Sequence, residues 1–401
     1  MNQNLAIRFG IDRLNGGERP FSPGARLGLL MNQASVTSTL EYSHDVLARC
    51  FPGQLAAIFT PQHGLWGEVQ ANMVESPHEI HGGLDVPLYS LYSETRRPTD
   101  AMLSEIDLLI VDLQDVGTRV FTFVWTVMEC LSACSANDVS VLVLDRPNPI
   151  GGIHVEGPRL VEGYTSFVGG AEIPMRHGLT MGELAMWLNQ HLKYDADLEV
   201  LPVSEWKRAA GFPADRVWIP PSPNLPTLDS CLVYPGQVLF EGTNVSEGRG
   251  TTRPFEVCGA PFVDPIELSS RLSVAKLPGV KFVPLRFTPT FDKWASQSCG
   301  GVAVHVTDPS IFRPFLTTAT IITLIHHAHP NDFSWLDPPY EYEQHLPPID
   351  IISGSNRLRR TLDRLAVAEL AWKDRLACLT ELADLDQEQW CEDSRHVWLY
   401  E

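Results

Sequence analysis

Short aliphatic runs alternate with amphipathic segments along the first half of the chain. Four of these runs have the composition of buried β-strands and lie at residues 25–33, 55–64, 107–112 and 139–145. Between them, residues 41–51 and 120–138 carry apolar side chains at helical spacing. Strands joined in this way by helices pair in parallel. The pattern therefore predicts an α/β fold, in which helices cover both faces of a mostly parallel sheet.

Polar side chains gather just after these predicted strands. In an open parallel sheet, the loops at the carboxyl ends of the strands line the ligand crevice. The polar residues at these ends are Asn32, Gln33, Gln62, His63, Asp112, Asp115, Asp145, Arg146 and Asn148. We therefore expect a binding site along this edge of the sheet.

A proline-rich stretch divides the chain into two parts. Residues 219–230, IPPSPNLPTLDS, favour an extended connector. We place a domain boundary there, with an N-terminal domain at residues 1–228 and a smaller C-terminal domain at residues 229–401. The second part has strand-like segments at 280–294 and 300–308, followed by helical segments that begin near Ile311 and Leu358. This mixture indicates an α+β domain.

Two further local patterns bear on the architecture. Residues 179–192 are helical in pattern, and Thr180 and Glu183 have the spacing of a capping box at the start of this helix. The apolar run VYPGQVLF at residues 233–240 is interpreted as a strand that leads into the following glycine-rich loop.

Composition excludes several classes of partner. The chain has 401 residues and a formal net charge of −19, which disfavours nucleic acid as a partner. No apolar run is long enough for membrane insertion, and the N-terminus lacks the apolar run of a secretory signal. The eight cysteines show no zinc-type spacing, which predicts free thiols. We therefore expect a cytoplasmic protein, unless a leader is missing from the sequence.

The segment richest in functional groups is residues 239–255, LFEGTNVSEGRGTTRPF. It places Glu241, Asn244, Glu247 and Arg249 among glycines, which allow sharp turns and close approach of the backbone to a ligand. A polar surface loop, whose glycines serve only turn geometry, accounts for this composition equally well.

Three other segments carry candidate site residues, which are Gln62, His63 and Glu68 in the first, Asp115 and Arg119 in the second, and Asp145, Arg146 and Asn148 in the third. A structural role for His63 is as well supported as a role in a site. Buried Asp–Arg pairs often only hold loops together, so at least one aspartate is expected to be structural.

The residue types narrow the chemistry. Carboxylates, amides and arginines with aromatic residues between them suit a sugar-binding cleft better than a nucleotide site. The chain contains no P-loop, dinucleotide-binding, zinc-protease or serine-hydrolase motif. Asp112, Asp115 and Asp145 give only weak support for a bound cation, so we expect neither a metal nor a cofactor.

Glycoside hydrolysis generally needs one protonated and one ionised carboxyl group. The candidates are Glu241, Glu247 and Glu68, with Asp115 in reserve. Our hypothesis takes Glu247 or Glu241 as the general acid, with its pKa raised by a partly apolar cleft. Glu68 or Asp115 is then the ionised partner.

Long motifs in the same order resemble a known family along nearly the whole chain. They are TPQHGLWGEVQANMVES, DLQDVGTRVFTF, LDRPNPIGG, IPMRHGLTMGELA, PSPNLP, LFEGTNVSEGRGTTRPFEVCGAPF, FTPTFDKWASQSCGGVAVHVTD and SGSNRLR. These motifs resemble the NamZ-type exo-β-N-acetylmuramidases, long catalogued as a domain of unknown function. The resemblance implies a Rossmann-like N-terminal domain, a smaller C-terminal domain, and a cleft between them. It also implies a small glycan substrate, from whose non-reducing end the enzyme releases N-acetylmuramic acid.

The site-like motifs of the family fall on Gln62, His63, Glu68, Asp115, Arg119, Asp145, Arg146, Asn148, Glu241, Asn244, Glu247 and Arg249. Arg119 and Arg249 are candidates for binding the lactyl carboxylate that distinguishes muramic acid from glucosamine, because a guanidinium matches a carboxylate bidentately.

One position departs from the family pattern. Many relatives have Pro-Glu-His-Gly where this chain has Pro61-Gln62-His63-Gly64. If that glutamate is the acid or the nucleophile, then Glu68, Glu241 or Glu247 serves here, or the chain prefers a different glycan. Two alternatives therefore stay open, a non-catalytic sensor of muropeptides or sugars and a hydrolase of another carboxylated glycan.

Overall fold

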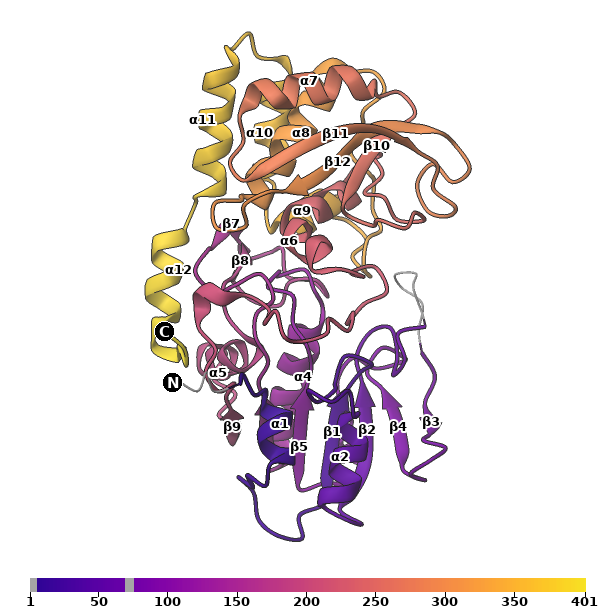
Figure 1. The fold of residues 1–401 in the computed structure, drawn as a ribbon, viewed down its shortest axis with the longest axis vertical. Helices are drawn as coiled ribbons and strands as arrows, with labels where there is room; N and C mark the ends of the chain where they lie inside the picture. The colour runs from indigo at the N-terminus through magenta and orange to yellow at the C-terminus, as the bar shows by residue number, and fades with distance from the viewer. Residues whose placement is uncertain (1–5, 69–75) are drawn as a thin grey trace.

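The first part of the molecule is built on a seven-stranded sheet (Figure 1). The structure is a computed structural model that describes residues 6–68 and 76–401. The strand order is β3-β4-β2-β1-β5-β6-β9, and every pairing is parallel except that of β3 with β4. The strands are β1 (Leu27–Met31), β2 (Leu55–Thr60), β3 (Glu79–Ile80), β4 (Pro87–Ser90), β5 (Leu108–Asp112), β6 (Ser140–Leu144) and β9 (Leu198–Leu201). The four predicted strands and the predicted mostly parallel sheet are confirmed.

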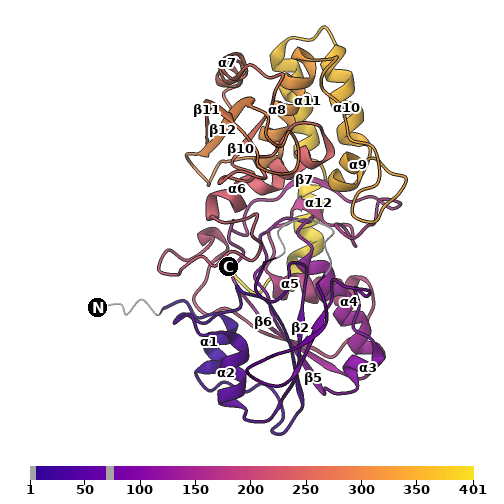
Figure 2. The same ribbon diagram turned by 90° about the vertical axis from the view of Figure 1, so that its right-hand side faces the viewer.

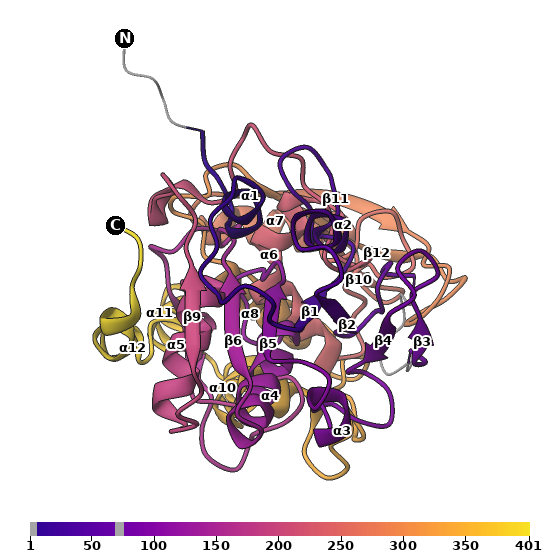
Figure 3. The same ribbon diagram turned by 90° about the horizontal axis from the view of Figure 1, so that it is seen from below.

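Helices cover both faces of this sheet because successive strand residues point to opposite sides. In β5, Leu108 and Ile110 belong to the apolar cluster beneath one layer, whereas Leu109 and Val111 belong to the cluster on the other face. The first layer contains α1 (Gly10–Asn15) and α2 (Ser43–Cys50). The second contains α3 (Asp100–Leu103), α4 (Phe123–Ala136) and α5 (Met181–His191). Figure 3 shows the two layers on either side of the strands.

The second part has a three-stranded antiparallel sheet of order β10-β12-β11. Its strands are β10 (Val257–Ala260), β11 (Val280–Phe287) and β12 (Cys299–Val306). Its helices are α6 (Leu228–Gln237), α7 (Pro265–Ala275), α8 (Pro314–Ala328), α9 (Pro348–Ser353), α10 (Arg357–Val367) and α11 (Trp372–Ala383). The predicted α+β character is confirmed. A two-stranded sheet of β7 (Glu156–Arg159) and β8 (Pro174–Arg176) lies between the two parts (Figure 1).

The prediction of a strand at residues 233–240 is wrong. This segment continues α6 into the 3₁₀ helix η2 (Val238–Gly242). The helix begins at a capping box, in which the Thr227 hydroxyl accepts a hydrogen bond from the backbone N–H of Ser230 at 3.0 Å. Cys231, Tyr234 and Val238 recur at helical spacing and are buried. The capping signal upstream of the apolar run therefore decides its structure.

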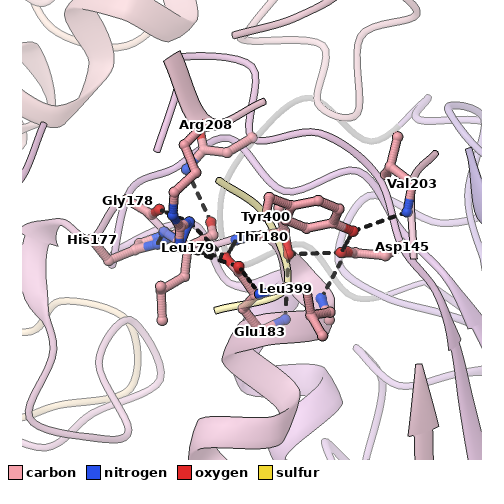
Figure 4. Close-up of polar contacts among 12 residues, drawn as sticks. Asp145, His177, Gly178, Leu179, Thr180, Glu183, Val203, Arg208, Leu399 and Tyr400 are labelled. Atoms are coloured by element: carbon pink, nitrogen blue, oxygen red, sulfur yellow. Dashed lines mark hydrogen bonds and ion pairs between the residues drawn. The ribbon is translucent and has the colours of Figure 1, made fainter. Parts of the chain in front are cut away.

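The C-terminal segment returns to the first part, where α12 (Gln387–Ser394) and the 3₁₀ helix η3 (Arg395–Val397) lie beside α5 (Figure 2). Figure 4 shows the buried polar contacts that fix it. The Tyr400 hydroxyl donates to Asp145 Oδ2 at 2.5 Å and accepts from the Val203 N–H at 2.9 Å. The backbone N–H of Leu399 donates to Glu183, which also forms the predicted capping box with Thr180. The last residues thereby hold the ends of β6 and β9 together.

The eight cysteines are free thiols, as the sequence predicts. Within residues 6–68 and 76–401, no helix combines the length and the apolar character needed to cross a bilayer.

We expect Tyr400→Phe to lower the free energy of unfolding by about 1–3 kcal/mol, because it leaves the buried Val203 N–H and the Asp145 carboxyl each without one partner. Urea denaturation measures this loss. Tyr89→Phe is the matched control, because the described residues give the Tyr89 hydroxyl no hydrogen bond. Equal stability of the two variants would contradict a stabilising role for the Tyr400 hydroxyl.

Candidate active site

Two neighbouring cavities lie where the first and second parts meet. They share one wall, formed by Glu241, Arg249, Tyr340 and Glu341. The narrow cavity has a volume of about 40 Å³, and the loop after β2 reaches it with Gln62 and His63. The open cavity has a volume of about 370 Å³ and is also lined by Glu247, Phe291, Asp292, Lys293, Leu336 and Pro339. The shared wall therefore brings carboxyl, guanidinium and phenol groups to both spaces.

Arg249 organises the carboxylates of this wall. Its Nη2 donates to Glu241 Oε1 at 2.5 Å, and its Nε lies 3.4 Å from Glu247 Oε1. Burial acts to lower the pKa of Arg249, but the two carboxylates outweigh this effect and raise it. The other oxygen of Glu241 accepts a hydrogen bond from the Tyr340 hydroxyl at 2.6 Å. Glu241 is thus fixed at both oxygens at the end of η2.

Glu247 lies next to this wall, in a buried ion network at the open cavity. Lys293 Nζ donates to Glu247 Oε2 at 2.8 Å and to the carbonyl oxygen of Phe240 at 2.7 Å. Burial acts to raise the pKa of Glu247, but the charges of Lys293 and Arg249 more than offset it, so the pKa lies below its usual value. Glu247 therefore stays ionised, and the geometry does not support the hypothesis that it is the general acid.

Glu341 is the carboxyl group on the wall with the properties of an acid. Burial and the nearby charge of Glu241 raise the pKa of Glu341 to about 7, although Arg249 and Arg96 oppose the shift. Its side chain is hydrogen-bonded with that of Tyr92 in the first part, and its Oε2 is buried without a hydrogen-bond partner among the described residues. A protonated carboxyl group fits this environment, because a buried uncharged oxygen costs less than a buried charged one.

Sequence reasoning missed Glu341, as well as Tyr340 beside it. Both lie in the loop between α8 and α9, which follows no predicted strand. The available signal was the sequence DPPYEYEQHLPP at residues 337–348, where tyrosines and glutamates alternate between prolines. Glu341 has φ of 43°, in the left-handed region that a glutamate seldom adopts. Backbone conformations of this kind are often found at functional sites.

Asp292 is a second carboxyl group with a raised pKa, owing to burial and the nearby Glu247. It lines only the open cavity, and although protein atoms partly surround its carboxyl group, the residue as a whole is exposed to solvent. Glu341 faces both cavities and shares its wall with Glu241, so it is the stronger candidate for acid catalysis.

The first part contributes neutral polar groups to the narrow cavity. Gln62 Oε1 accepts a hydrogen bond from Thr122 Oγ1 at 2.7 Å, and His63 Nε2 lies 3.1 Å from Ser222 Oγ. Ser222 and Asn224 come from the proline-rich stretch, which sequence reasoning treated only as a connector. The loop after β2 and this stretch therefore meet at the site.

The structure does not bring Arg119 or Asp115 to either cavity. The Arg119 guanidinium donates to the carbonyl oxygens of Pro158, Ile173 and Ile352 at 2.8–2.9 Å, and burial lowers its pKa to about 9. Asp115 accepts from the Gly117 N–H at 2.6 Å and lies 3.3 Å from His177 Nε2. Arg119 thus links the two parts through Ile352, whereas Asp115 holds a loop within the first part, and this geometry gives Arg119 no access to a substrate carboxylate.

The group at the end of β6 has a similar structural role. Asp145 accepts from Thr180 Oγ1 at 2.7 Å, from the Gly182 N–H at 2.8 Å and from Tyr400. Arg146 forms a bidentate ion pair with Asp112, with N–O distances of 2.6 and 2.9 Å. Asn148 Nδ2 donates to the Leu179 carbonyl at 3.0 Å. These polar residues at the strand ends are satisfied by other groups of the protein, and they line neither of the two cavities.

Two further predicted residues lie outside the cavities. Glu68 is exposed and lines neither cavity. Asn244 links loops, because its Nδ2 donates to the Asp332 carbonyl at 2.7 Å and its Oδ1 accepts from the Ser334 N–H at 3.0 Å. Residues 69–75, which complete the motif that contains Gln62, lie outside the described residues. In the part of the chain that is described, no group of three or more His, Cys, Asp or Glu side chains could hold a metal ion.

Comparison with known proteins identifies the family. A family model described as "Exo-beta-N-acetylmuramidase NamZ, N-terminal" matches residues 27–229, and its C-terminal counterpart matches residues 232–400. The chain belongs to this family. The resemblance inferred from the sequence motifs is confirmed.

Individual relatives agree with this assignment. The chain is 44% identical over 331 residues to the peptidoglycan beta-N-acetylmuramidase NamZ of Bacillus subtilis (strain 168). The aligned region covers 82% of this chain and 80% of that protein. Crystal structures of two DUF1343 family proteins from Bacteroides fragilis NCTC 9343 are similar along almost their whole length. One has a TM-score of 0.87 and 30% identity, covering 98% of this chain and 99% of the other. The second has a TM-score of 0.74 and 27% identity, covering 99% of both chains.

We expect Glu247→Gln to destabilise the fold by about 3–5 kcal/mol, because it leaves Lys293 without its buried carboxylate partner. Thermal or urea denaturation measures the change. Glu68→Gln is the control, since exposed substitutions usually change stability by less than about 0.5 kcal/mol. A Glu247→Gln protein as stable as the Glu68→Gln protein would show that the ion network contributes little.

Proposed function

We propose that this chain is a glycoside hydrolase that releases terminal N-acetylmuramic acid from the non-reducing end of peptidoglycan fragments. Its membership of the muramidase family supports the reaction class, and its similarity to the peptidoglycan beta-N-acetylmuramidase of Bacillus subtilis supports the peptidoglycan substrate. The observation that carries the proposal is the pair of Glu241 and Glu341 on one wall, because their different surroundings suit the two carboxyl roles of glycoside hydrolysis.

In this mechanism Glu341 is the general acid. It donates its proton to the glycosidic oxygen as the bond from that oxygen to the anomeric carbon breaks. Its raised pKa keeps the proton available close to neutral pH. Glu241 is the charged partner, held in place by Arg249 and Tyr340. Glu247 lines the same open cavity and supports Glu241 through Arg249.

Arg249 is our candidate for the lactyl carboxylate of the substrate. It borders both cavities, and only its Nη2 donates a hydrogen bond to a described residue. A substrate carboxylate that approaches this guanidinium from the open cavity gains a charge-assisted hydrogen bond. The same contact is absent for a glucosamine substrate, which lacks the lactyl group.

We also propose that residues 1–228 and 229–401 are two domains, with the site at their junction. We place the protein in the cytoplasm, where imported fragments of peptidoglycan would be its substrates. The eight free thiols support this location, because thiols stay reduced in that compartment.

Turnover of a chromogenic N-acetylmuramic acid β-glycoside by the purified chain tests the proposed function. Release of the chromophore by the wild type supports a hydrolase. Binding of the sugar in calorimetry without any release would instead favour the sensor, which is the alternative that an amide at position 62 suggests. Release from another carboxylated glycoside but not from this one would favour the alternative hydrolase.

We expect Glu341→Gln to lower kcat by at least about a thousandfold while the fold stays intact, because an amide cannot supply the proton. The wild-type rate should fall as the pH rises through about 7, since the raised pKa of Glu341 keeps its proton below that pH and loses it above. Steady-state kinetics over a series of pH values, with an aryl glycoside whose leaving group is poor, gives both kcat and the pH profile of kcat/KM. Glu343→Gln, two residues along the same loop, is the control. A Glu341→Gln enzyme with wild-type kcat and the same alkaline limb would exclude this residue as the acid.

We expect Arg249→Lys to lower kcat/KM on an N-acetylmuramic acid glycoside by about 10–100-fold more than on the matching N-acetylglucosamine glycoside, because one charge-assisted hydrogen bond is lost only with the former. Steady-state kinetics on the two substrates measures this ratio. Arg253→Lys is the control, since Arg253 pairs with Glu256 and borders neither cavity. An equal loss of kcat/KM on both substrates would mean that Arg249 does not bind the lactyl group.

A further inference from the structure

The two cavities differ in the size of molecule that they admit. The open cavity, at about 370 Å³, falls within the range of small-molecule sites, which is roughly 300–1,000 Å³. The narrow cavity, at about 40 Å³, is far below that range. A water molecule needs only about 10–15 Å³ on the same measure. The narrow cavity therefore has room for a few water molecules and no room for a sugar ring.

The walls of the narrow cavity supply the polar partners that bound water requires. Gln62 lines this cavity, and its carbonyl is held by the Thr122 hydroxyl, which leaves its Nε2 hydrogens available as donors. Tyr234 also lines this cavity. Among the described residues, neither Gln62 Nε2 nor the Tyr234 hydroxyl has a hydrogen-bond partner, and neither atom is enclosed by protein. Ordered water typically makes two to four such bonds.

Glu241 connects this space to the reacting centre, because it lines both cavities. A water molecule in the narrow cavity can donate to the Glu241 carboxylate while it accepts from Gln62 and Tyr234. The amide of Gln62 can orient this water but cannot take its proton, because an amide nitrogen is not a base. Two carboxyl groups line this cavity, and Glu341 is already the acid, so Glu241, which is held by Arg249, is our candidate to take the proton of an attacking water.

We propose that the narrow cavity is the site of the hydrolytic water, which Gln62 and Tyr234 orient toward Glu241 while the sugar occupies the open cavity. This inference rests on the proposed function. In the attack step the water oxygen forms a bond to the anomeric carbon, and one of its protons passes to Glu241. The bond from that carbon to the glycosidic oxygen breaks, and this oxygen takes the electron pair of the bond and the proton of Glu341.

Competition between water and methanol tests the site. With a chromogenic N-acetylmuramic acid glycoside in the presence of methanol, the wild type should yield free sugar almost exclusively. Gln62→Ala removes the orienting amide and widens the cavity, so the ratio of methyl glycoside to free sugar should rise at least about fivefold, as expected for the loss of one ordinary hydrogen bond to water. KM for the glycoside should stay within about twofold, because the substrate lies in the open cavity.

Two further variants make the test decisive. Tyr234→Phe removes the second donor with little change in volume, so it should raise the same product ratio even if Gln62→Ala folds poorly. Gln190→Ala, on the exposed side of α5, should leave both the ratio and KM unchanged. A ratio of methyl glycoside to free sugar that stays unchanged in both cavity variants would overturn the water site. If KM also rose at least tenfold in these variants, the narrow cavity would be a binding site for the sugar. A wild type that releases no sugar would overturn the proposed function itself.

Discussion

The pairing of Arg249 and Lys293 with Glu241 and Glu247 is the constraint on which the site depends. Two cations and two carboxylates lie together with little contact with water, and each charge is balanced by an opposite charge within about 2.5–3.4 Å. Breaking such a network leaves an uncompensated buried charge, which is strongly unfavourable. Glu341 lies beside Glu241, and no cation of the described residues is in hydrogen-bond contact with it, so taking up a proton is its least costly state.

The fold was largely predictable from local patterns, because strands buried on both faces leave a strong apolar signal. Leu108–Asp112 and Ser140–Leu144 are examples. The error at residues 233–240 arose where a short apolar run fits a strand and a helix alike, and where the deciding signal was the cap at Thr227. Local pattern also predicted polar residues at the strand ends, but it could not tell which of them face a ligand. Asp145 and Arg146 are satisfied by other protein groups.

The site itself was only partly predictable. Gln62, His63, Glu241 and Arg249 were proposed from their motifs, and the structure places them around one pair of cavities. Glu341 could not be found in this way, because its acidity is a property of position. It comes from an irregular loop and acquires its raised pKa only through burial beside Glu241, while the hydrogen bond with Tyr92 from the other part of the chain opposes this rise. These three residues are far apart in the sequence, so local patterns do not indicate that they lie close together.

The pKa of Glu341 depends on its position between the two parts of the molecule. This dependence explains why many of the polar residues that stand out in the sequence have structural roles. The environment of Glu341 is formed by both parts of the molecule, so a change in their separation would alter its solvation and hence its pKa. Arg119 ties β7 and β8 to the end of α9 through three carbonyl oxygens, and Tyr400 fixes the returning C-terminal segment to Asp145. Each of these buried contacts costs desolvation that only a complete set of partners offsets. A rigid junction is therefore a requirement for the acid, and the residues that provide it need not touch the substrate.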